Sequence, residues 1–392
     1  MGRYSDASIA DSNQTHWQGG GINYPVKTPS GVLYLIYIDS NQQLSFKKSP
    51  DGGVTWGTQT SIAATGIENL AVWYDRWSNI SAGLIHLAYT GNSADDTFYR
   101  TIDTESSDAL STQTVIFSGT STAGGGHLSI ARAVGGNVYC KTVIDAGAEG
   151  GFYRLPNANV PNGAWDAART VDEAIATTDQ MILLPDYDAA DTQDIMAIFW
   201  DASADEISRK LYDDSANSWA ETSIAGTMVD TVATSSFPHF AVAMDIANTR
   251  HILVAWSAVD AANQDLRCWT VDSGTITEVT PVVSNATDDC GFAAIGLDTA
   301  TGYWHAFYAG KSDGSETFKT SVNIYCKVSQ DGGTTWGSEF LLTTSTRGVG
   351  WLATAPRFTG SISVIHFHDA TVDTLRCIAA SASPVARFQL GM

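Results

Sequence analysis

Short apolar segments recur along the chain at a nearly constant spacing. In one kind of segment, an apolar strand ends in most copies at an aromatic residue, and a small or acidic turn follows. Seven copies can be read, with anchors near Tyr37, Tyr89, Ile144, Trp200, Trp256, Tyr308 and His368. Successive anchors are about 52 to 60 residues apart, the length of one small four-stranded sheet in a repeat architecture. The spacing therefore predicts many copies of one small sheet.

Two further segments accompany each anchor strand. The segment after it carries a basic residue or a cysteine, as in LSFKKS, TFYRTI, GFYRLP, ISRKLY, DLRCWT, NIYCKV and TLRCIA. The segment before it is almost continuously apolar, as in INYPVKT, NLAVWYD, HLSIARA, MILLPDY, HFAVAMD, FAAIGLD and WLATAPRF. Continuous apolar runs are typical of strands buried on both faces, so these are expected to be the inner strands.

These repeats predict an all-β fold, a seven-bladed β-propeller with four-stranded blades, as a single domain over residues 1–392. Each blade is a twisted sheet that buries its faces against its neighbours around an axis. The ring must also be closed by pairing the two ends of the chain. Residues near Tyr4 to Ala10 are expected to add a strand to the last blade, with the C-terminal ARFQLGM as the alternative.

Two turns share a specific motif, Ser-x-Asp-x-Gly-x-Thr-Trp. It is complete at residues 49–56 and 329–336, and a weaker copy lies at 213–219. At this point the sequence resembles the Asp-box propellers, whose BNR repeats are of the sialidase type. In that family the turn joins the third and fourth strands of a blade, on the face away from the active site. The resemblance therefore implies that Asp51 and Asp331 are structural, because an Asp carboxylate can accept backbone N–H groups of its own turn.

Composition limits the function classes. The formal net charge is -21, which opposes binding to nucleic acid and to anionic membranes. The chain has no apolar run of membrane-spanning length, and its start, MGRYSDASIADSNQ, has no apolar core of a signal peptide. We expect an extracellular or virion-associated protein. The five cysteines form no CxxC pair, and Cys140, Cys268, Cys326 and Cys377 lie in apolar runs, which predicts buried free thiols.

The strand directions indicate where a site would lie. If the boxes mark one face, the inner strands begin and the second strands end on the other. The expected lining from inner-strand starts is Trp17, Gln18, Glu68, Asn69, His127, Asp179, Gln180, His239, Asp288, Asp289, Arg347 and Trp351. The connections after the second strands add Asp39, Asn92, Asp145, Asp201, Lys311, His368 and Asp369. Aromatic faces and hydrogen-bonding groups of this kind are typical of sugar sites, and the predicted substrate-binding residues are Trp17, Asn69, Asp179, Asp289, Trp351 and His368.

Three enzymatic chemistries are compatible with this set. The resemblance includes propellers that cleave uronate polysaccharides by β-elimination, which needs a group to neutralise the carboxylate, a base and an acid. The candidates for these roles are His127, His239, Arg347 and Tyr24, with Tyr187 and His368 as further candidates. A glycosidase would use a carboxylate pair from among Glu68, Asp179, Asp201 and Asp289.

The positions of the arginines argue against the third chemistry, exo-sialidase activity. The resembled family carries an Arg-Ile-Pro phrase on its first inner strand, and Asn23 stands in place of that arginine in Ile22-Asn23-Tyr24-Pro25. Several arginines lie instead on the third strands, namely Arg100, Arg154, Arg209, Arg267 and Arg376. Those left as candidates for the site face are Arg76, Arg347 and Arg357.

Two non-enzymatic alternatives remain open: a glycan-binding propeller, lectin-like or from a phage receptor-binding module, and a purely structural or protein-binding one. The strand scaffold repeats but the expected lining does not, which favours one asymmetric central site. The expected partner is a polysaccharide or other glycan. No cofactor is predicted; the acidic stretch at 186–194 could bind calcium but lacks EF-hand spacing.

Overall fold

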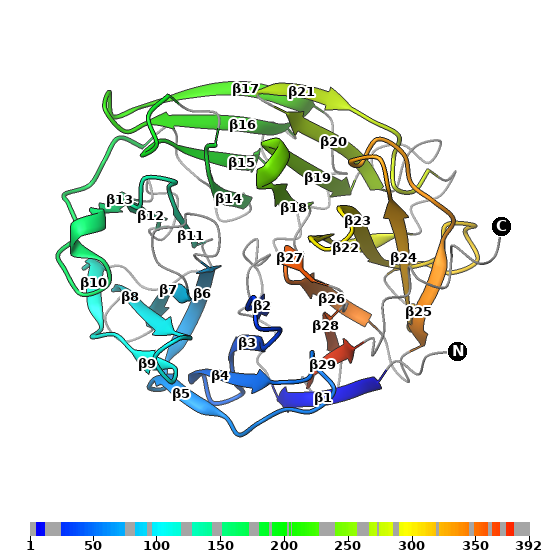
Figure 1. The fold of residues 1–392 in the computed structure, drawn as a ribbon, viewed down its shortest axis with the longest axis horizontal. Coiled ribbons are helices and arrows are strands. Elements are labelled where there is room, and N and C mark those ends of the chain that lie inside the picture. The colour runs from blue at the N-terminus through cyan, green and yellow to red at the C-terminus, as the bar shows by residue number, and fades with distance from the viewer. Residues whose placement is uncertain are drawn as a thin grey trace.

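The computed structural model of the chain describes residues 5–11, 25–74, 83–91, 96–118, 128–142, 151–171, 180–187, 190–201, 204, 206–226, 240–256, 266–272, 274–284, 290–318, 321–344, 349–359, 363–368 and 374–379. Their strands form seven separate sheets around a common axis, antiparallel except for one short parallel pair in the sixth (Figure 1). The inner strands are β2 (Pro25–Lys27), β6 (Ile67–Tyr74), β11 (Ser129–Arg132), β14 (Gln180–Pro185), β18 (Phe240–Asp245), β22 (Gly291–Asp298) and β26 (Val349–Thr354).

Each inner strand is followed outward by the predicted second and third strands. The second strands are β3 (Leu33–Ile38), β7 (Leu84–Gly91), β12 (Val138–Lys141), β15 (Ile195–Asp201), β19 (Arg250–Trp256), β23 (Tyr303–Ala309) and β28 (Ser363–His368). The third strands are β4 (Leu44–Ser49), β8 (Thr97–Asp103), β13 (Phe152–Leu155), β16 (Glu206–Asp213), β20 (Leu266–Asp272), β24 (Asn323–Ser329) and β29 (Thr374–Ala379). We number the sheets 1 to 7 by the order of these inner strands along the chain.

The outer strands complete six of the sheets. They are β5 (Thr60–Ala63), β10 (Thr114–Phe117), β17 (Ser218–Gly226), β21 (Thr275–Glu278), β25 (Phe340–Thr344) and β1 (Ser5–Asp11). Two short strands, β9 (Ala109–Leu110) and β27 (Arg357–Phe358), pair with β8 and β22. The described residues thus form six complete blades, in sheets 1, 2, 4, 5, 6 and 7, and not the seven predicted.

Sheet 3 is the exception, because it has three strands within the described residues. After β13 the chain enters a short 3-10 helix, η2 (Asn157–Asn159), preceded by Pro156 and followed by Pro161. Proline has no N–H to donate to a ladder. Among the described residues, the returning chain meets β13 at an isolated bridge between Phe152 and Arg169, with bonds from Asp166 N to Arg154 O (2.8 Å) and from Arg169 N to Phe152 O (2.7 Å). The described residues after β13 therefore form no full outer strand.

The first and last sheets are joined as predicted, by a strand from the N-terminal residues that is added to the last sheet. Strand β1 pairs antiparallel with β29, from Ser5 opposite Ala379 to Asp11 opposite Thr374. The first strand of the chain is thereby the outer strand of the last sheet (Figure 1). The C-terminal ARFQLGM lies outside the described residues.

The apolar runs of the sequence form the core. All six residues of β14 are buried, as are all six of β3. Inner strands of neighbouring sheets contact one another, as β18 contacts β22 and β22 contacts β26. Cys140, Cys268, Cys326 and Cys377 are buried thiols, as predicted, and Cys290 is also buried. Burial on both faces explains why these segments lack the alternation of a half-exposed strand.

The two complete turn motifs have the geometry expected of them. Asp51 Oδ1 accepts the backbone N–H of Thr55 (2.8 Å) and the Ser49 hydroxyl (2.7 Å), and the Thr55 N–H bond lowers the pKa of this carboxyl. Asp331 accepts the N–H of Thr335 (2.9 Å) in the same way. Gly52 and Gly53 adopt φ values of 72° and 105°, which side chains rarely tolerate. Both carboxylates therefore serve the fold.

Replacing Gly53 by alanine tests the junction between sheets 7 and 1. An added Cβ would lie 2.5 Å from the Cys377 thiol of β29, at a φ of +105°. The control is Gly31→Ala, where φ is +88° but nothing lies within 4 Å. We expect the control to lose about 1 to 2 kcal/mol from backbone strain and Gly53→Ala to lose a further ~2 kcal/mol from overpacking. Denaturant unfolding measures both, and equal losses would contradict the close packing of these two sheets.

Candidate functional site

The strand registers define one end of the sheets as the candidate site. Gln180, where β14 begins, pairs with Trp200 near the end of β15. Gly291 pairs with Ala309 and Val349 pairs with His368 in the same sense. The starts of the inner strands and the connections that follow the second strands therefore share one face. We call these two sets of residues the mouth. The predicted strand directions are confirmed, since both complete turn motifs lie at the opposite end.

Most of the predicted site residues lie outside the described part of the chain. These are Trp17, Tyr24, His127, Asp179, His239, Asp289 and Arg347. Along the chain, Tyr24, Asp179 and His239 immediately precede β2, β14 and β18. Trp351 lies on β26 and His368 ends β28, although their side chains are not among those described. Their assignment to a catalytic or binding role thus stays a prediction.

Three polar residues described at the mouth differ in burial. Asn69 lies near the start of β6 and is partly exposed, whereas Gln180 is fully buried at the start of β14. Asp201, at the end of β15, is partly exposed and accepts the N–H of Ala204 (3.0 Å). The mouth therefore offers carboxylate and amide groups to a ligand in sheets 2 and 4.

Asp39 has a structural role that the sequence did not indicate. The residue is 8% exposed, and its carboxylate accepts the backbone N–H groups of Asn41 (2.8 Å) and Gln43 (3.0 Å). The Gln59 side-chain amide donates to its second oxygen (2.9 Å). Asp39 therefore shapes its turn and is not a free sugar ligand. Gln59 was not singled out from the sequence.

Glu339 bonds to a connection at the mouth, as Gln59 does, and the two residues have the same position relative to their turn motifs. Gln59 stands three residues after the motif residue Trp56, and Glu339 stands three residues after Trp336. Glu339 Oε2 accepts the Tyr308 hydroxyl (2.8 Å) and the Ser312 N–H (2.9 Å). The two complete motifs thus share a polar residue that reaches the connection at the mouth, a signal that was readable from their alignment.

Two candidates from the sequence lie at the wrong end of their sheets. Tyr187 follows β14, whose far end pairs Pro185 with Ile195. Arg357, on β27, pairs with Leu297 next to the end of β22. Both residues follow the end of an inner strand, and an inner strand that begins at the mouth ends at the opposite face. Neither therefore belongs to the mouth.

The arginines and lysines of the third strands join neighbouring sheets. At the face opposite the mouth, a basic side chain of one sheet reaches the turn between the third and fourth strands of the next. The contacts are Lys48 to Asp108, Arg154 to Asp214, Arg209 to the Gly274 carbonyl (3.4 Å) and, from a second strand, Arg250 to the Gly332 carbonyl (2.8 Å). In sheets 1, 3 and 4 the recurring basic residue of the sequence repeat is thus explained by contacts between sheets, whereas Arg267 of sheet 5 pairs with Glu278 of its own sheet.

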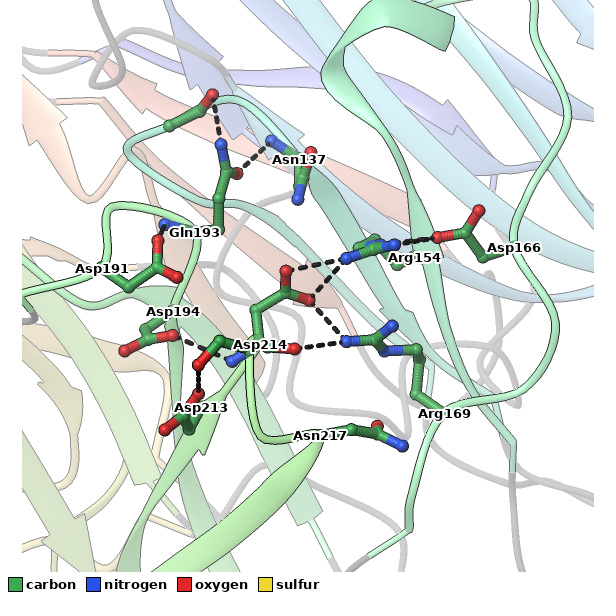
Figure 2. A network of polar contacts seen from close by, with 12 residues as sticks. Asn137, Arg154, Asp166, Arg169, Asp191, Gln193, Asp194, Asp213, Asp214 and Asn217 are labelled. Carbon is green, nitrogen blue, oxygen red and sulfur yellow. Dashed lines mark hydrogen bonds and ion pairs between the residues drawn. The ribbon is translucent and has the colours of Figure 1, made fainter.

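The largest of these contacts is a network between sheets 3 and 4, drawn in Figure 2. Arg154 and Arg169 both reach Asp214, at 2.7 and 2.8 Å. Arg154 also donates to Asp166 (2.6 Å). Asp194 accepts the Asp214 N–H (2.9 Å), and burial raises the pKa of Asp194. The network lies at the weak third motif copy, and its arginines take the place of the glycine-rich turn in linking the sheets.

Removing the central carboxylate of this network should weaken the fold. The Asp214 side chain is 10% exposed, so Asp214→Asn leaves two partly buried guanidinium groups without their shared anion. We expect a loss of about 3 kcal/mol in the free energy of unfolding. The control is Glu278→Gln, whose 44% exposed carboxylate pairs with Arg267, with an expected loss of about 0.5 kcal/mol. Urea denaturation measures both, and a loss from Asp214→Asn as small as that of the control would contradict this role.

Other features of the described residues bear on ligand classes. Among them, no group of three or more His, Cys, Asp or Glu side chains is placed to hold a metal ion. His86 and His305 are buried within their sheets. No helix in the described part of the chain has the length and hydropathy needed to cross a membrane.

Comparison with known proteins supports the fold. No protein-family model and no curated protein sequence matches the chain. Among solved structures, it is similar to the BP39L lectin from Burkholderia pseudomallei, with a TM-score of 0.63 and 13% identity over 97% of this chain and 98% of that one. It is similar to a PL25 ulvan lyase, with a TM-score of 0.57 and 10% identity over 100% of both chains. For the polysaccharide lyase Uly1 the TM-score is 0.51, at 9% identity over 95% of this chain and 93% of that one. At such identities the likeness establishes an all-β propeller and nothing finer.

Proposed function

We propose that this propeller binds a uronate-containing polysaccharide at the mouth and cleaves it by β-elimination. One observation carries the proposal: the strands repeat from sheet to sheet, but the polar residues at the mouth do not. The residues directly before β2, β14 and β18 are Tyr24, Asp179 and His239. A lectin built from repeats would be expected to repeat its site as well. A non-repeated set favours one site on the axis.

The residue types suit an elimination. A base must remove the proton next to the carboxylate, and an acid must protonate the leaving oxygen. Histidine and tyrosine can perform these steps because their pKa values are tuned by their surroundings toward the working pH. We assign His127 and His239 as candidates for the base, Tyr24 as a candidate for the acid, and Arg347 as a group that neutralises the carboxylate. Two of the similar solved structures are polysaccharide lyases, and each match covers nearly the whole of this chain.

The experiment is to incubate the protein with a panel of uronate polysaccharides and to follow the ultraviolet absorbance of the unsaturated uronate product. Reducing ends and released sialic acid are measured in parallel. We expect new absorbance with at least one polymer. Reducing ends without absorbance would indicate hydrolysis instead, with Glu68, Asp179, Asp201 and Asp289 as the carboxylates to test. Released sialic acid would indicate an exo-sialidase.

The second candidate function is glycan binding without cleavage. The observation that favours it is the similarity to the BP39L lectin, which has the highest TM-score of the three similar structures. In this case all three product assays stay silent while the protein still binds glycans on an array. That outcome would overturn the enzymatic proposal and retain the glycan site.

A further inference from the structure

The connection after β23 lies at the mouth and is stabilised by its own backbone hydrogen bonds. It begins beyond Ala309, which pairs with Gly291 at the start of inner strand β22. Within it, the Lys311 N–H donates to the Glu316 carbonyl (3.2 Å) and the Gly314 N–H to the Lys311 carbonyl (3.0 Å). These backbone bonds close a compact turn that carries Lys311 and Asp313 at the mouth end of sheet 6.

Two carboxylates tie this turn to the sheet. Glu339 accepts from the Tyr308 hydroxyl and the Ser312 N–H, as described above. Glu316 accepts from the Asn323 side-chain amide (2.7 Å), the Tyr325 hydroxyl (2.9 Å) and the Ser321 hydroxyl (3.0 Å). Burial, together with these carboxylates, raises the pKa of Tyr308 and of Tyr325, so both tyrosines remain donors at neutral pH.

The same connection packs against the inner strand. Phe318 is 1% exposed, and its ring lies so close to Gly291 that a Cβ there would come within 2.7 Å of it. The end of the connection near Phe318 therefore lies next to the first residue of β22. The turn of Lys311 lies at the same mouth end of sheet 6, where Ser312 bonds to Glu339, directly before β25.

Lys311 is an available cation in a strongly acidic protein. Its ammonium contacts Asp313, with side chains 36% and 54% exposed, and lies 3.5 Å from the Ser315 hydroxyl. Ion pairs this exposed contribute little stability, so a ligand carboxylate can replace Asp313 at small cost. With a net charge of -21, binding of an anionic polymer requires such a local cation.

We propose that Lys311 binds the carboxylate of an acidic sugar residue at the mouth and thereby selects anionic over neutral polysaccharides. This inference rests on the proposed function and adds a specificity-determining residue to it. The ammonium binds the substrate in its ground state and in the transition state alike. Its loss should therefore raise KM and leave kcat nearly unchanged.

The test compares Lys311→Gln with Lys311→Arg and with a matched control, Lys48→Gln. Lys48 is another exposed lysine paired with an aspartate, Asp108, but at the face opposite the mouth. The probes are polyglucuronate and its carboxyl-reduced, neutral counterpart, and the readouts are KM and kcat for cleavage and Kd for binding. For Lys311→Gln with polyglucuronate we expect KM and Kd to rise about tenfold, as for the loss of a charged hydrogen bond. Lys311→Arg and Lys48→Gln should stay near the unsubstituted protein.

The outcomes separate this inference from the proposed function. If the unsubstituted protein binds or cleaves polyglucuronate and Lys311→Gln does so equally well, the role of Lys311 is overturned and the proposed function stands. An equal loss with the carboxyl-reduced polymer would also overturn it, because a carboxylate contact cannot affect a neutral ligand. If the unsubstituted protein neither binds nor cleaves polyglucuronate or any other polymer of the uronate panel, the proposed function and the inference both fail.

Discussion

Replacing His127 or His239 by alanine is expected to reduce the rate of polysaccharide cleavage by about 10²- to 10⁴-fold, the usual contribution of a general acid or base. Both residues are close in sequence to the start of an inner strand, β11 or β18, at the mouth. The measurement is kcat from the ultraviolet absorbance of the product, together with the melting temperature of each variant.

The control for this prediction is Tyr187→Phe. Tyr187 was also a candidate from the sequence, but the structure places it after β14, at the face opposite the mouth. Removal of the Tyr187 hydroxyl should leave kcat unchanged. The histidine variants should keep the melting temperature of the unsubstituted protein. If both histidine variants keep the kcat of the unsubstituted protein, or if kcat falls only together with the melting temperature, the two histidines have no catalytic role.

Acid is expected to destabilise the fold through two buried histidines. His251 is 2% and His305 1% exposed, and among the described residues neither ring nitrogen of His305 has a hydrogen-bond partner. Burial lowers the pKa of His251 to about 3, with the nearby Arg209 charge adding to the effect. Burial lowers the pKa of His305 to about 4, although Asp298 acts in the opposite direction. Both rings are therefore neutral in the folded protein at neutral pH.

The direction of the pH effect follows from these values. In the unfolded chain a histidine takes up its proton near pH 6.5, whereas the folded chain resists protonation until about pH 4 for His305 and about pH 3 for His251. Between these limits the unfolded state binds more protons. The contribution of the two histidines to the free energy of unfolding is thus complete above pH 6.5. As the pH falls below 6.5, the free energy of unfolding decreases by up to about 1.4 kcal/mol per pH unit for each histidine.

The variant that tests this is the double substitution His251→Phe with His305→Phe. We expect urea denaturation of the unsubstituted protein to show stability falling between pH 6.5 and 4, and the double variant to show a much shallower fall. The remaining slope would come from the carboxylates. Parallel pH profiles for the two proteins would show that these imidazoles do not control the acid sensitivity.

The strand scaffold could be predicted from the sequence because its signals are local. A continuous apolar run such as that of β14 identifies an inner strand by itself, and the Asp51 turn is specified by its own neighbours Ser49, Gly53 and Thr55. The register then follows, since a second strand must return antiparallel to the first. The face on which the mouth lies was predictable for the same reason.

The errors concern contacts between residues distant in sequence. Within the described part of the chain, sheet 3 has no full outer strand, which reflects the prolines and the 3-10 helix η2 after β13 that the anchor spacing does not reveal. Asp39 was predicted to be part of the lining because its place in the repeat is visible, but its bond from Gln59, which gives it a structural role, joins residues 20 positions apart. The link between Arg154 and Asp214 spans 60 positions, and no sequence period indicates it.

The central claim is that the chain has one asymmetric site at the mouth. It is tested most directly by isothermal titration calorimetry of the His239→Ala variant with a tetrasaccharide prepared from polyglucuronate, since this variant should bind without cleaving. The account predicts a single binding site per chain, weakened in the further variant Lys311→Gln. Several equivalent sites per chain, one for each of the repeated sheets, would contradict it and identify the protein as a repeat lectin.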